Sequence, residues 1–252
     1  MKAQALLEVR NLRKAFGGVV AVSDVSFDVA PGELVALIGP NGAGKTTCFN
    51  LINGQLAPDA GSIRLAGKSI AGMPAQRIAA LGVGRTFQTA AIFASMSVRE
   101  NVQLALIAHG GEQWQLTTRA NASHLQAADA LLARVGATAL ADSTCATLAY
   151  GDLKRVELAV ALASSPRLLL MDEPTAGTAP GDRAQLMRLT SALVRGDGMA
   201  ALFTEHDMDV VFAHADRVIM LDRGEIIAQG LPAEVRADPR ARAAYFGVES
   251  AE

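Results

Sequence analysis

The sequence predicts an α/β fold built around a mainly parallel β-sheet. Two continuous apolar runs of strand length, residues 34–38 and 167–171, fit strands that are buried on both faces of a sheet. Segments with helical spacing lie between such runs, and strands that alternate with helices are typical of parallel sheets. Of the 252 residues, 50% are hydrophobic and 19% are charged, which provides the apolar material for a large core.

Valine-rich stretches and turn residues divide the first part of the chain. Gly17-Gly18 separates two strand-like stretches, and Pro31-Gly32 precedes the apolar run at 34–38. A helical pattern follows that run and ends at Gly54. The elements expected here are strands at 6–9, 19–29, 34–38 and 63–65 and a helix at 45–53.

A helical lobe is expected in the middle of the chain. Between about residues 98 and 164 the chain becomes alanine-rich, and apolar residues recur on one helical face, as at Leu125, Ala128, Leu132 and Val135. The later elements expected are strands at 167–171, 200–203, 218–221 and 225–228 and helices at 182–195, 207–214 and 231–248. The charged residues of 182–188 are interpreted as the solvated face of their helix.

The composition argues against several classes of protein. A net charge of −2 and a pI of about 6.1 provide no general basic field for nucleic acid, whose binding depends largely on Lys and Arg contacts to phosphate. Cys48 and Cys145 lie far apart, which argues against a disulfide framework and against a zinc site. No stretch approaches the roughly 20 apolar residues of a membrane span, and residues 1–8 lack a secretory signal pattern. We therefore expect a cytoplasmic protein that reaches a membrane only through a partner.

A phosphate-binding loop follows the strand at 34–38. The pattern G-x-x-x-x-G-K-[ST] is matched in full by Gly39, Pro40, Asn41, Gly42, Ala43, Gly44, Lys45 and Thr46. Glycines allow backbone N–H groups to surround phosphate, and the helix that follows adds its positive dipole end. Lys45 is expected to reach the β- and γ-phosphates, and the Thr46 hydroxyl is expected to bind Mg²⁺. Because a chance match has a probability on the order of 1%, the loop predicts nucleotide binding.

Acidic residues and a histidine end two of the later apolar runs. Asp172 and Glu173 follow the run at 167–171, and His206 follows the run at 200–203. Since ligands bind at the carboxyl ends of parallel strands, these side chains are expected at the same rim as the phosphate loop. Asp172 suits a ligand of Mg²⁺, Glu173 suits a general base for an attacking water, and His206 suits a hydrogen bond to the γ-phosphate. The alternative interpretation is an acidic pair at a helix N-terminus before Pro174, and the phosphate loop earlier in the chain favours the functional role.

Taken together, these motifs resemble the nucleotide-binding subunit of ATP-binding cassette (ABC) transporters, over residues 7–247. The resemblance implies a P-loop NTPase core with a mainly parallel sheet, an N-terminal antiparallel β subdomain and an inserted α-helical lobe. It also implies a single ABC ATPase domain over 1–252, with a core lobe at 1–89 and 164–252 and the helical lobe at about 90–163.

The resemblance assigns further binding residues. Phe16 matches the aromatic residue that stacks on adenine, and Thr47 completes the phosphate loop. Gln88 matches the glutamine that senses Mg²⁺ and the attacking water, and is therefore expected in both the metal site and the catalytic site. Residues 89–101 resemble the surface that contacts a membrane subunit. The implied cofactors are ATP and Mg²⁺.

The family signature corresponds to Leu148-Ala-Tyr-Gly-Asp152. Its expected ATP-binding residues are Ala149, Tyr150, Gly151 and Asp152. Gly151 is expected to open a helix at 152–163, and a helix N-terminus is an anion site. In the family this site contacts the ATP held by a partner chain, so that two ATPs are buried between two cassettes.

Two departures from the family pattern are informative. The usual signature is Leu-Ser-Gly-Gly-Gln, and the alanine at position 149 removes one phosphate donor. The Leu-Ala-Tyr-Gly form resembles the larger ATPase subunit of importers of branched-chain amino acids and related amides or urea. Thr178-Ala179 stands where family members carry Leu followed by Asp or Asn, which implies that the two ATP sites are not fully equivalent.

The resemblance also implies partners and a location. The expected partners are transmembrane permease subunits, a second ATPase subunit in a heterodimer, with a homodimer as the alternative, and indirectly a solute-binding protein, but no nucleic acid. The expected location is the cytoplasmic face of the inner (plasma) membrane. The alternative functions are the ATPase of a lipid or lipopolysaccharide export system, a soluble non-transport ABC protein, and a small-molecule kinase. A kinase leaves Gln88, His206 and residues 148–152 without a role.

Overall fold

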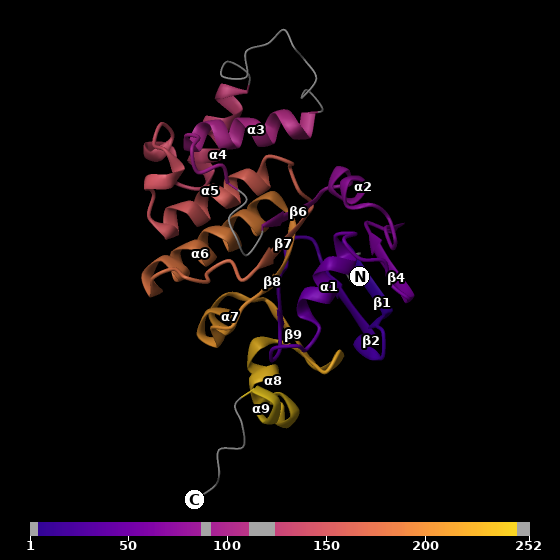
Figure 1. Cartoon of the computed structure of the whole chain (residues 1–252). Helices are drawn as coiled ribbons and strands as arrows, with labels where there is room; N and C mark the ends of the chain where they lie inside the picture. The colour runs from indigo at the N-terminus through magenta and orange to yellow at the C-terminus, as the bar shows by residue number, and fades with distance from the viewer. Residues whose placement is uncertain (1–4, 87–91, 111–123, 246–252) are drawn as a thin grey trace, which may run out of the picture.

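The structure is a computed structural model that describes residues 5–86, 92–110 and 124–245, and its strands form two sheets (Figure 1). The small sheet is antiparallel and has the order β2-β1-β4-β5. The large sheet has the order β10-β9-β3-β8-β7-β6 and is parallel except for the β10–β9 pair. The strands are β1 (Leu7–Phe16), β2 (Val19–Val29), β3 (Leu34–Ile38), β4 (Ala60–Leu65), β5 (Lys68–Ser69), β6 (Val83–Thr86), β7 (Leu168–Asp172), β8 (Ala200–Thr204), β9 (Arg217–Asp222) and β10 (Glu225–Gly230).

The central strands of the large sheet are buried on both faces, as their continuous apolar runs predict. All five residues of β3 and of β8 are buried. Alternate side chains of each strand enter different core clusters, so that Leu34 and Phe203 face one layer while Val35 and Leu202 face the other. The sheet is therefore fixed from both sides, and its strand ends provide a rigid rim.

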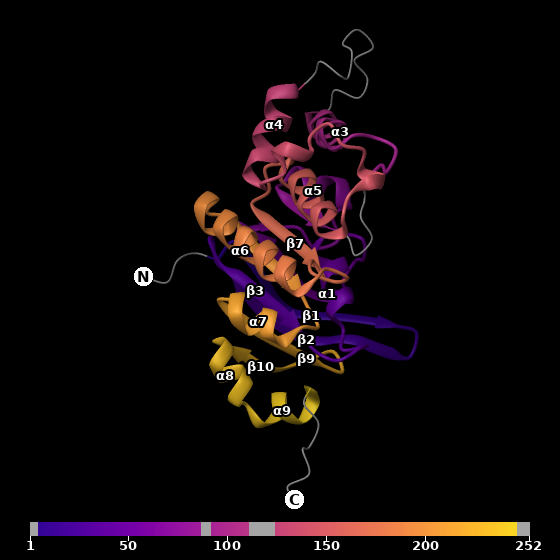
Figure 2. The ribbon, with the colours of Figure 1, turned by 90° about the vertical axis from the view of Figure 1, so that its left-hand side faces the viewer.

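Helices and the small sheet supply the two covering layers. One face is covered by α5 (Tyr150–Leu162), α6 (Pro180–Asp197) and α7 (Met208–His214), and Figure 2 shows α6 and α7 in front of the strands. The other face packs against α1 (Lys45–Ile52) and the small sheet. The remaining α-helices are α2 (Ala75–Ala80), α3 (Val98–Gly110), α4 (Leu125–Arg134), α8 (Pro232–Ala237) and α9 (Pro239–Tyr245), and two short 3-10 helices lie at Thr138–Leu140 and Cys145–Thr147.

The helices α3 and α4 pack with α5 at one end of the molecule (Figure 1). These elements form a helical insert between β6 and β7, and the predicted fold class is thereby confirmed. Within the described ranges, no helix combines the length and the apolar character needed to cross a membrane.

Several predicted boundaries differ from the structure. The strand expected at 6–9 continues to Phe16 as β1, and the strand expected at 63–65 begins at Ala60. The single helix expected at 231–248 is two short helices, because Pro239 cannot continue the first one and Asp238 adopts an extended conformation. The helix expected at 182–195 begins earlier, at Pro180, a residue well suited to a first helical turn. The helix expected to open at Gly151 begins at Tyr150, with Ala149 as its N-cap.

Candidate functional site

The phosphate loop makes a tight turn between β3 and α1, and its glycines are required by close backbone contacts. A Cβ added to Gly39 would lie 2.1 Å from the carbonyl oxygen of Leu221, and one added to Gly44 would lie 2.4 Å from that of Ala21. Both glycines have positive φ, at +148° and +103°. Their replacement would therefore displace the loop from the strands that flank it.

The side chain of Lys45 folds back into this loop. Its Nζ donates hydrogen bonds to the carbonyl oxygens of Gly39 at 2.6 Å and Pro40 at 3.1 Å. Burial lowers the pKa of Lys45, while the carboxylates of Glu173 and Asp172 act in the opposite direction. The ammonium group therefore lies inside the loop and in the field of both acids.

A pocket of about 200 Å³ opens beside the loop at the rim of the large sheet. It is lined by Ala21, Asn41, Gly42, Ala43, Gly44, Lys45, Thr46, Thr47, Asp172, Glu173 and His206. The structure thus brings most of the predicted phosphate loop together with the three residues expected at strand ends. Thr46 and the acidic side chains place oxygen atoms in the same pocket as the lysine.

Asp172, the last residue of β7, is oriented by both neighbouring strands. Its Oδ1 accepts a hydrogen bond from Thr204 Oγ1 of β8 at 2.7 Å, and its Oδ2 lies 3.4 Å from the guanidinium of Arg85 in β6. Arg85 also donates to Asn50 of α1 at 2.8 Å. The carboxylate is therefore fixed in direction beside the phosphate loop.

Glu173 stands in a strained backbone position. Its φ is +49°, an uncommon value for a residue with a side chain, and its N–H donates to the carbonyl and the hydroxyl of Thr204 at 3.2 Å and 3.1 Å. Its Oε1 lies 3.0 Å from Nε2 of His206. Because an ionised carboxylate can only accept, the imidazole donates in this pair, and the predicted base and histidine are direct neighbours.

Thr204 is a site residue that the sequence analysis did not identify. It is 1% exposed, and its hydroxyl contacts both Asp172 and Glu173. A buried hydroxyl at the end of an apolar strand has to be hydrogen-bonded, so a polar residue directly before Glu205-His206 was the available signal.

Phe16 and the signature residues do not line this pocket. Phe16 is 47% exposed at the end of β1, with Lys14 Nζ 5.6 Å from the centroid of its ring. Gln88 lies outside the described residues. The signature residues at 149–152 do not line the pocket of their own chain.

The signature turn packs against the segment that follows Glu173. A Cβ added to Gly177 would lie 3.0 Å from Cε1 of Tyr150, and one added to Gly151 would lie 3.0 Å from a carboxylate oxygen of Asp182. The ring of Tyr150 also lies under Lys154, whose Nζ is 5.4 Å from the ring centroid. The first turn of α5 is thus seated on the start of α6.

Comparison with known proteins identifies relatives. The chain is 37% identical, over an alignment of 258 positions, to the "High-affinity branched-chain amino acid transport ATP-binding protein LivG" of Escherichia coli K12. The alignment covers 97% of this chain and 99% of that protein. It is 36% identical to the corresponding BraF protein of Pseudomonas aeruginosa, over 97% of this chain and 99% of BraF. It is also 36% identical to the "Lipopolysaccharide export system ATP-binding protein LptB" of Acidithiobacillus ferridurans, covering 96% of this chain and 97% of that protein.

Solved structures show the same fold. The ADP conformation of MJ1267, an ATP-binding cassette of an ABC transporter, superposes with a TM-score of 0.88 at 30% identity, covering 97% of this chain and 100% of that one. A nucleotide-free cassette superposes with a TM-score of 0.85 at 30% identity, covering 96% and 99%.

Family models match two parts of the sequence. Residues 225–251 match a model described as "Branched-chain amino acid ATP-binding cassette transporter". Residues 22–176, more than half of the chain, match the model described as "ABC transporter". The resemblance drawn from the motifs is therefore confirmed, and the chain belongs to the ATP-binding cassette family of ABC transporter proteins.

Proposed function

We propose that the chain binds and hydrolyses ATP as one subunit of a membrane transporter. The observation that carries this proposal is that the phosphate-binding residues and the signature turn lie at different places on the same chain. The phosphate loop, Asp172, Glu173 and His206 share one pocket, whereas the signature turn at 149–152 does not line it. A second cassette would supply that turn to the pocket, which supports ATP binding at an interface between two ATPase subunits.

The pocket fits Mg²⁺ by the chemistry of its donors. Thr46 and Asp172 both line it and both offer oxygen atoms. That arrangement suits Mg²⁺, which is usually bound by one or two protein oxygens together with substrate phosphates. When bound, Mg²⁺ would neutralise charge on the β- and γ-phosphates, with Thr46 and Asp172 as its protein ligands.

Each side chain of the pocket has a separate role in hydrolysis. Glu173 accepts a proton from a water molecule as the water oxygen bonds to the γ-phosphorus, and the bond from that phosphorus to the β–γ bridging oxygen breaks to release ADP. His206 orients Glu173 through the 3.0 Å contact and lies beside the transferred phosphoryl group. Lys45 and the amides of the loop stabilise the charge on the phosphates.

Three observations support import of branched-chain amino acids or related amides. The Leu-Ala-Tyr-Gly form at 148–151 resembles that subgroup, and residues 225–251 match its family model. LivG and BraF, which are named for that transport, match over nearly the whole chain. The relative named for lipopolysaccharide export keeps an export ATPase as the second candidate, but the match at 225–251 favours import.

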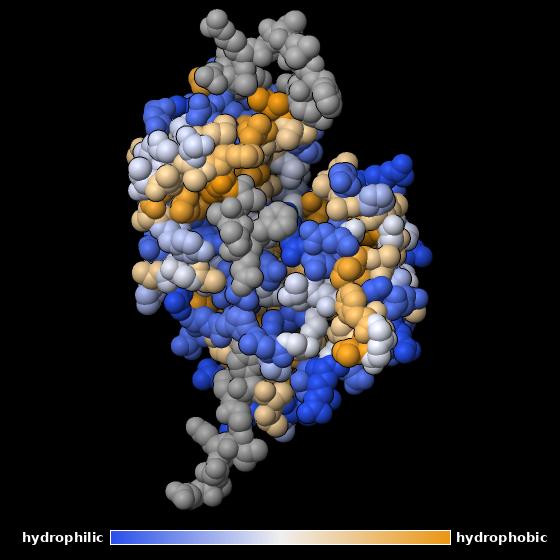
Figure 3. Space-filling model, viewed as in Figure 1, coloured by the Kyte–Doolittle hydropathy of each residue, from blue (hydrophilic) through white to orange (hydrophobic). Residues whose placement is uncertain are grey.

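Exposed apolar side chains on the helical insert support contact with a permease. Phe93 is 57% exposed and Leu104 of α3 is 37% exposed. Figure 3 shows hydrophobic surface gathered over the region of α3, α4 and α5, and a second, narrower strip over the small sheet at the right. Phe93 falls within residues 89–101, where the resemblance places the contact with the membrane subunit. Through that contact the chain would lie on the cytoplasmic face of the membrane.

Affinity purification of a trapped variant tests the proposal. The Glu173→Gln variant should bind ATP like the wild type, while its turnover falls about 10²- to 10⁴-fold because it lacks the general base. We would tag this variant, extract it from native membranes with Mg-ATP and identify its partners by mass spectrometry. Permease subunits, a second and different ATPase and a solute-binding protein are expected, whereas soluble partners alone would refute transport.

A further inference from the structure

We infer that Arg183 is a positioning residue for His206. It connects the loop that carries His206 with the segment that follows Glu173, and thereby sets where the imidazole stands during hydrolysis. The inference rests on the proposed ATPase function. Interpreting Arg183 as part of a solvated helix face was wrong, because the structure gives its guanidinium defined partners in both of these loops.

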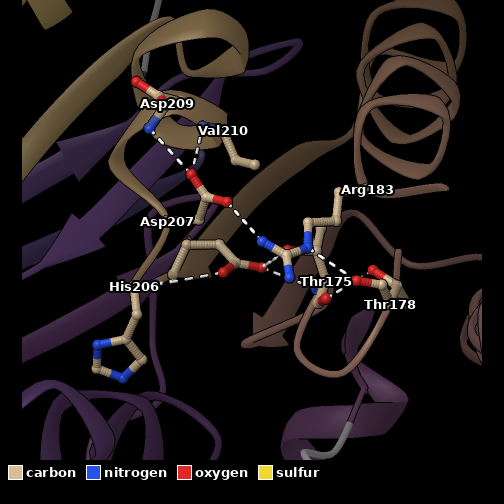
Figure 4. A network of polar contacts seen from close by, with 8 residues as sticks. Thr175, Thr178, Arg183, His206, Asp207, Asp209 and Val210 are labelled. Carbon is tan, nitrogen blue, oxygen red and sulfur yellow. Dashed lines mark hydrogen bonds and ion pairs between the residues drawn. The ribbon is translucent and has the colours of Figure 1, made fainter. Parts of the chain in front are cut away.

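The guanidinium of Arg183 bridges two loops that are distant in sequence. Its Nη1 donates to Oδ2 of Asp207 at 2.7 Å, and its Nε donates to the carbonyl oxygen of Thr178 at 2.9 Å. Figure 4 shows Arg183 and Asp207 pointing toward one another, while the ring of His206 points away from them. Because Asp207 directly follows His206, this ion pair fixes the backbone on the carboxyl side of the histidine.

Asp207 also connects the loop that carries His206, here called the histidine loop, to α7. Its Oδ1 accepts hydrogen bonds from the N–H groups of Asp209 at 3.1 Å and Val210 at 3.3 Å, and so caps the helix (Figure 4). One carboxylate therefore joins the helix start and the Arg183 side chain. The histidine loop is held against α6 and α7 at the same point.

A second connection lies on the other side of the histidine. Glu205 is 4% exposed, and its Oε1 accepts hydrogen bonds from the N–H of Thr175 at 2.8 Å and from its hydroxyl at 2.7 Å. Thr178 is also buried, and its hydroxyl donates to the carbonyl oxygen of Thr175 at 2.7 Å. Both neighbours of His206 are thus connected to residues 175–183 of the same chain.

These backbone connections are important because the imidazole itself is half exposed. The side chain of His206 is 47% exposed and contacts Glu173 through Nε2 at 3.0 Å. Its position consequently depends on the flanking backbone, and displacements of about 1 Å in a catalytic group can cost 10²-fold in rate. Arg183 is the better residue to test, because its side chain is 33% exposed whereas Glu205 is buried.

The test compares five variants of the full chain with the wild type. Arg183→Gln and Asp207→Asn each remove the ion pair, the double variant removes both partners, and Arg183→Lys retains a positive charge. Arg195→Gln is the matched control. Arg195 lies in the same helix and forms an ion pair with Asp216 at 2.7 Å, and neither residue lines the pocket. We would measure kcat and KM for ATP, the thermal midpoint of unfolding, and the NMR signals of the histidine rings.

The expected kinetic result is specific to positioning. Arg183→Gln and Asp207→Asn should each lower kcat about 10- to 100-fold while KM changes by less than about threefold. The double variant should be no slower than the slower single one, because both changes break one interaction. Arg183→Lys should recover most of the rate, and the control Arg195→Gln should match the wild type.

Ring signals in a ¹⁵N-histidine-labelled chain give a readout independent of turnover. The chain has four histidines, and His206→Gln would assign the signals of His206. In Arg183→Gln these signals should shift or broaden, while those of His109 and His124 stay unchanged. Unaltered His206 signals together with wild-type kcat would overturn the inference, as would equal slowing by the control. All variants are assayed in the complex captured with their partners, because the pocket needs the signature turn of a second cassette. If the wild-type complex released no phosphate from ATP, the proposed function would fail and this inference with it.

Discussion

Replacing Thr204 with valine removes one hydroxyl at the end of β8 and leaves the side-chain volume nearly unchanged. The residue is 1% exposed, so no water replaces the lost group. The hydroxyl donates to Oδ1 of Asp172 at 2.7 Å and accepts from the N–H of Glu173 at 3.1 Å. The N–H of Glu173 retains the carbonyl oxygen of Thr204 at 3.2 Å. The main loss is therefore a hydrogen bond to a carboxylate.

The size of the effect follows from those partners. A hydrogen bond to a charged group contributes about 1.5–3 kcal/mol, so Thr204→Val should lower the free energy of unfolding by about 2–3 kcal/mol. Thr204→Ser keeps the hydroxyl and removes one buried methyl group, which should cost only about 1 kcal/mol. Valine should therefore be the more damaging replacement, although it fills the space better.

Urea unfolding at neutral pH measures both values, with Thr190→Val as a matched control. Thr190 is also 1% exposed, but its hydroxyl donates to the carbonyl oxygen of Leu186 in the preceding turn of α6. Because no charged partner is lost there, the control should cost about 1 kcal/mol or less. A Thr204→Val variant at least as stable as Thr204→Ser would refute the argument.

Thr204→Val should also affect the proposed Mg²⁺ site through Asp172. Groups that hydrogen-bond to metal ligands typically contribute 10- to 100-fold in metal affinity or activity. The Mg²⁺ concentration needed for half-maximal ATP hydrolysis should therefore rise by about 10-fold or more in Thr204→Val and stay near the wild-type value in Thr204→Ser. A Mg²⁺ titration of phosphate release checks this, and equal Mg²⁺ requirements for both variants would contradict it.

Three further changes test other parts of the site. Lys45→Ala should weaken binding of a fluorescent ATP analogue by about 10- to 100-fold, since a charge-assisted hydrogen bond to phosphate is lost, and unchanged affinity would contradict the assigned role of the loop. Gly177→Ala should lower the free energy of unfolding, measured with urea, by about 1–2 kcal/mol, because φ is +76° and the new Cβ would lie 3.0 Å from the ring of Tyr150. Adding Tyr150→Ala to the same chain should recover part of that loss. Burial alone would raise the pKa of Asp207, but hydrogen bonds from Arg183 and from backbone N–H groups lower that pKa overall. A folded-state pKa below the unfolded value gives a stabilisation that is present above about pH 4 and is lost as pH falls further, so the stability difference between wild type and Asp207→Asn should shrink in acid. A difference that stays constant down to about pH 2 would argue against that linkage.

The sequence predicts the rim of the site well because topology alone brings its residues together. The apolar runs at 34–38 and 167–171 form β3 and β7, and both strands pair in parallel with β8, which lies between them. The phosphate loop and Asp172 therefore lie at the same edge of the sheet. His206 follows for the same reason. Residues whose position depends only on a strand end are thus accessible to sequence reasoning.

Other contacts could not be predicted because they depend on side-chain partners distant in sequence. The spacing of charges on α6 cannot show that Arg183 reaches Asp207, 24 residues later. Thr204 is polar like many strand-terminal residues, and only the packed sheet reveals its two acidic neighbours. Likewise, the contact between Tyr150 and Gly177 depends on how α5 is seated on the start of α6.

The inward fold of Lys45 has a consequence for the thermodynamics of nucleotide binding. A lysine side chain loses up to about 2 kcal/mol of conformational entropy when it is immobilised. Here the two carbonyl groups at Gly39 and Pro40 immobilise it during folding of the chain. When a triphosphate binds, its oxygens replace these carbonyl groups as acceptors for an ammonium group that is already in place. Little further side-chain entropy is then lost on binding, which favours a higher affinity for the nucleotide.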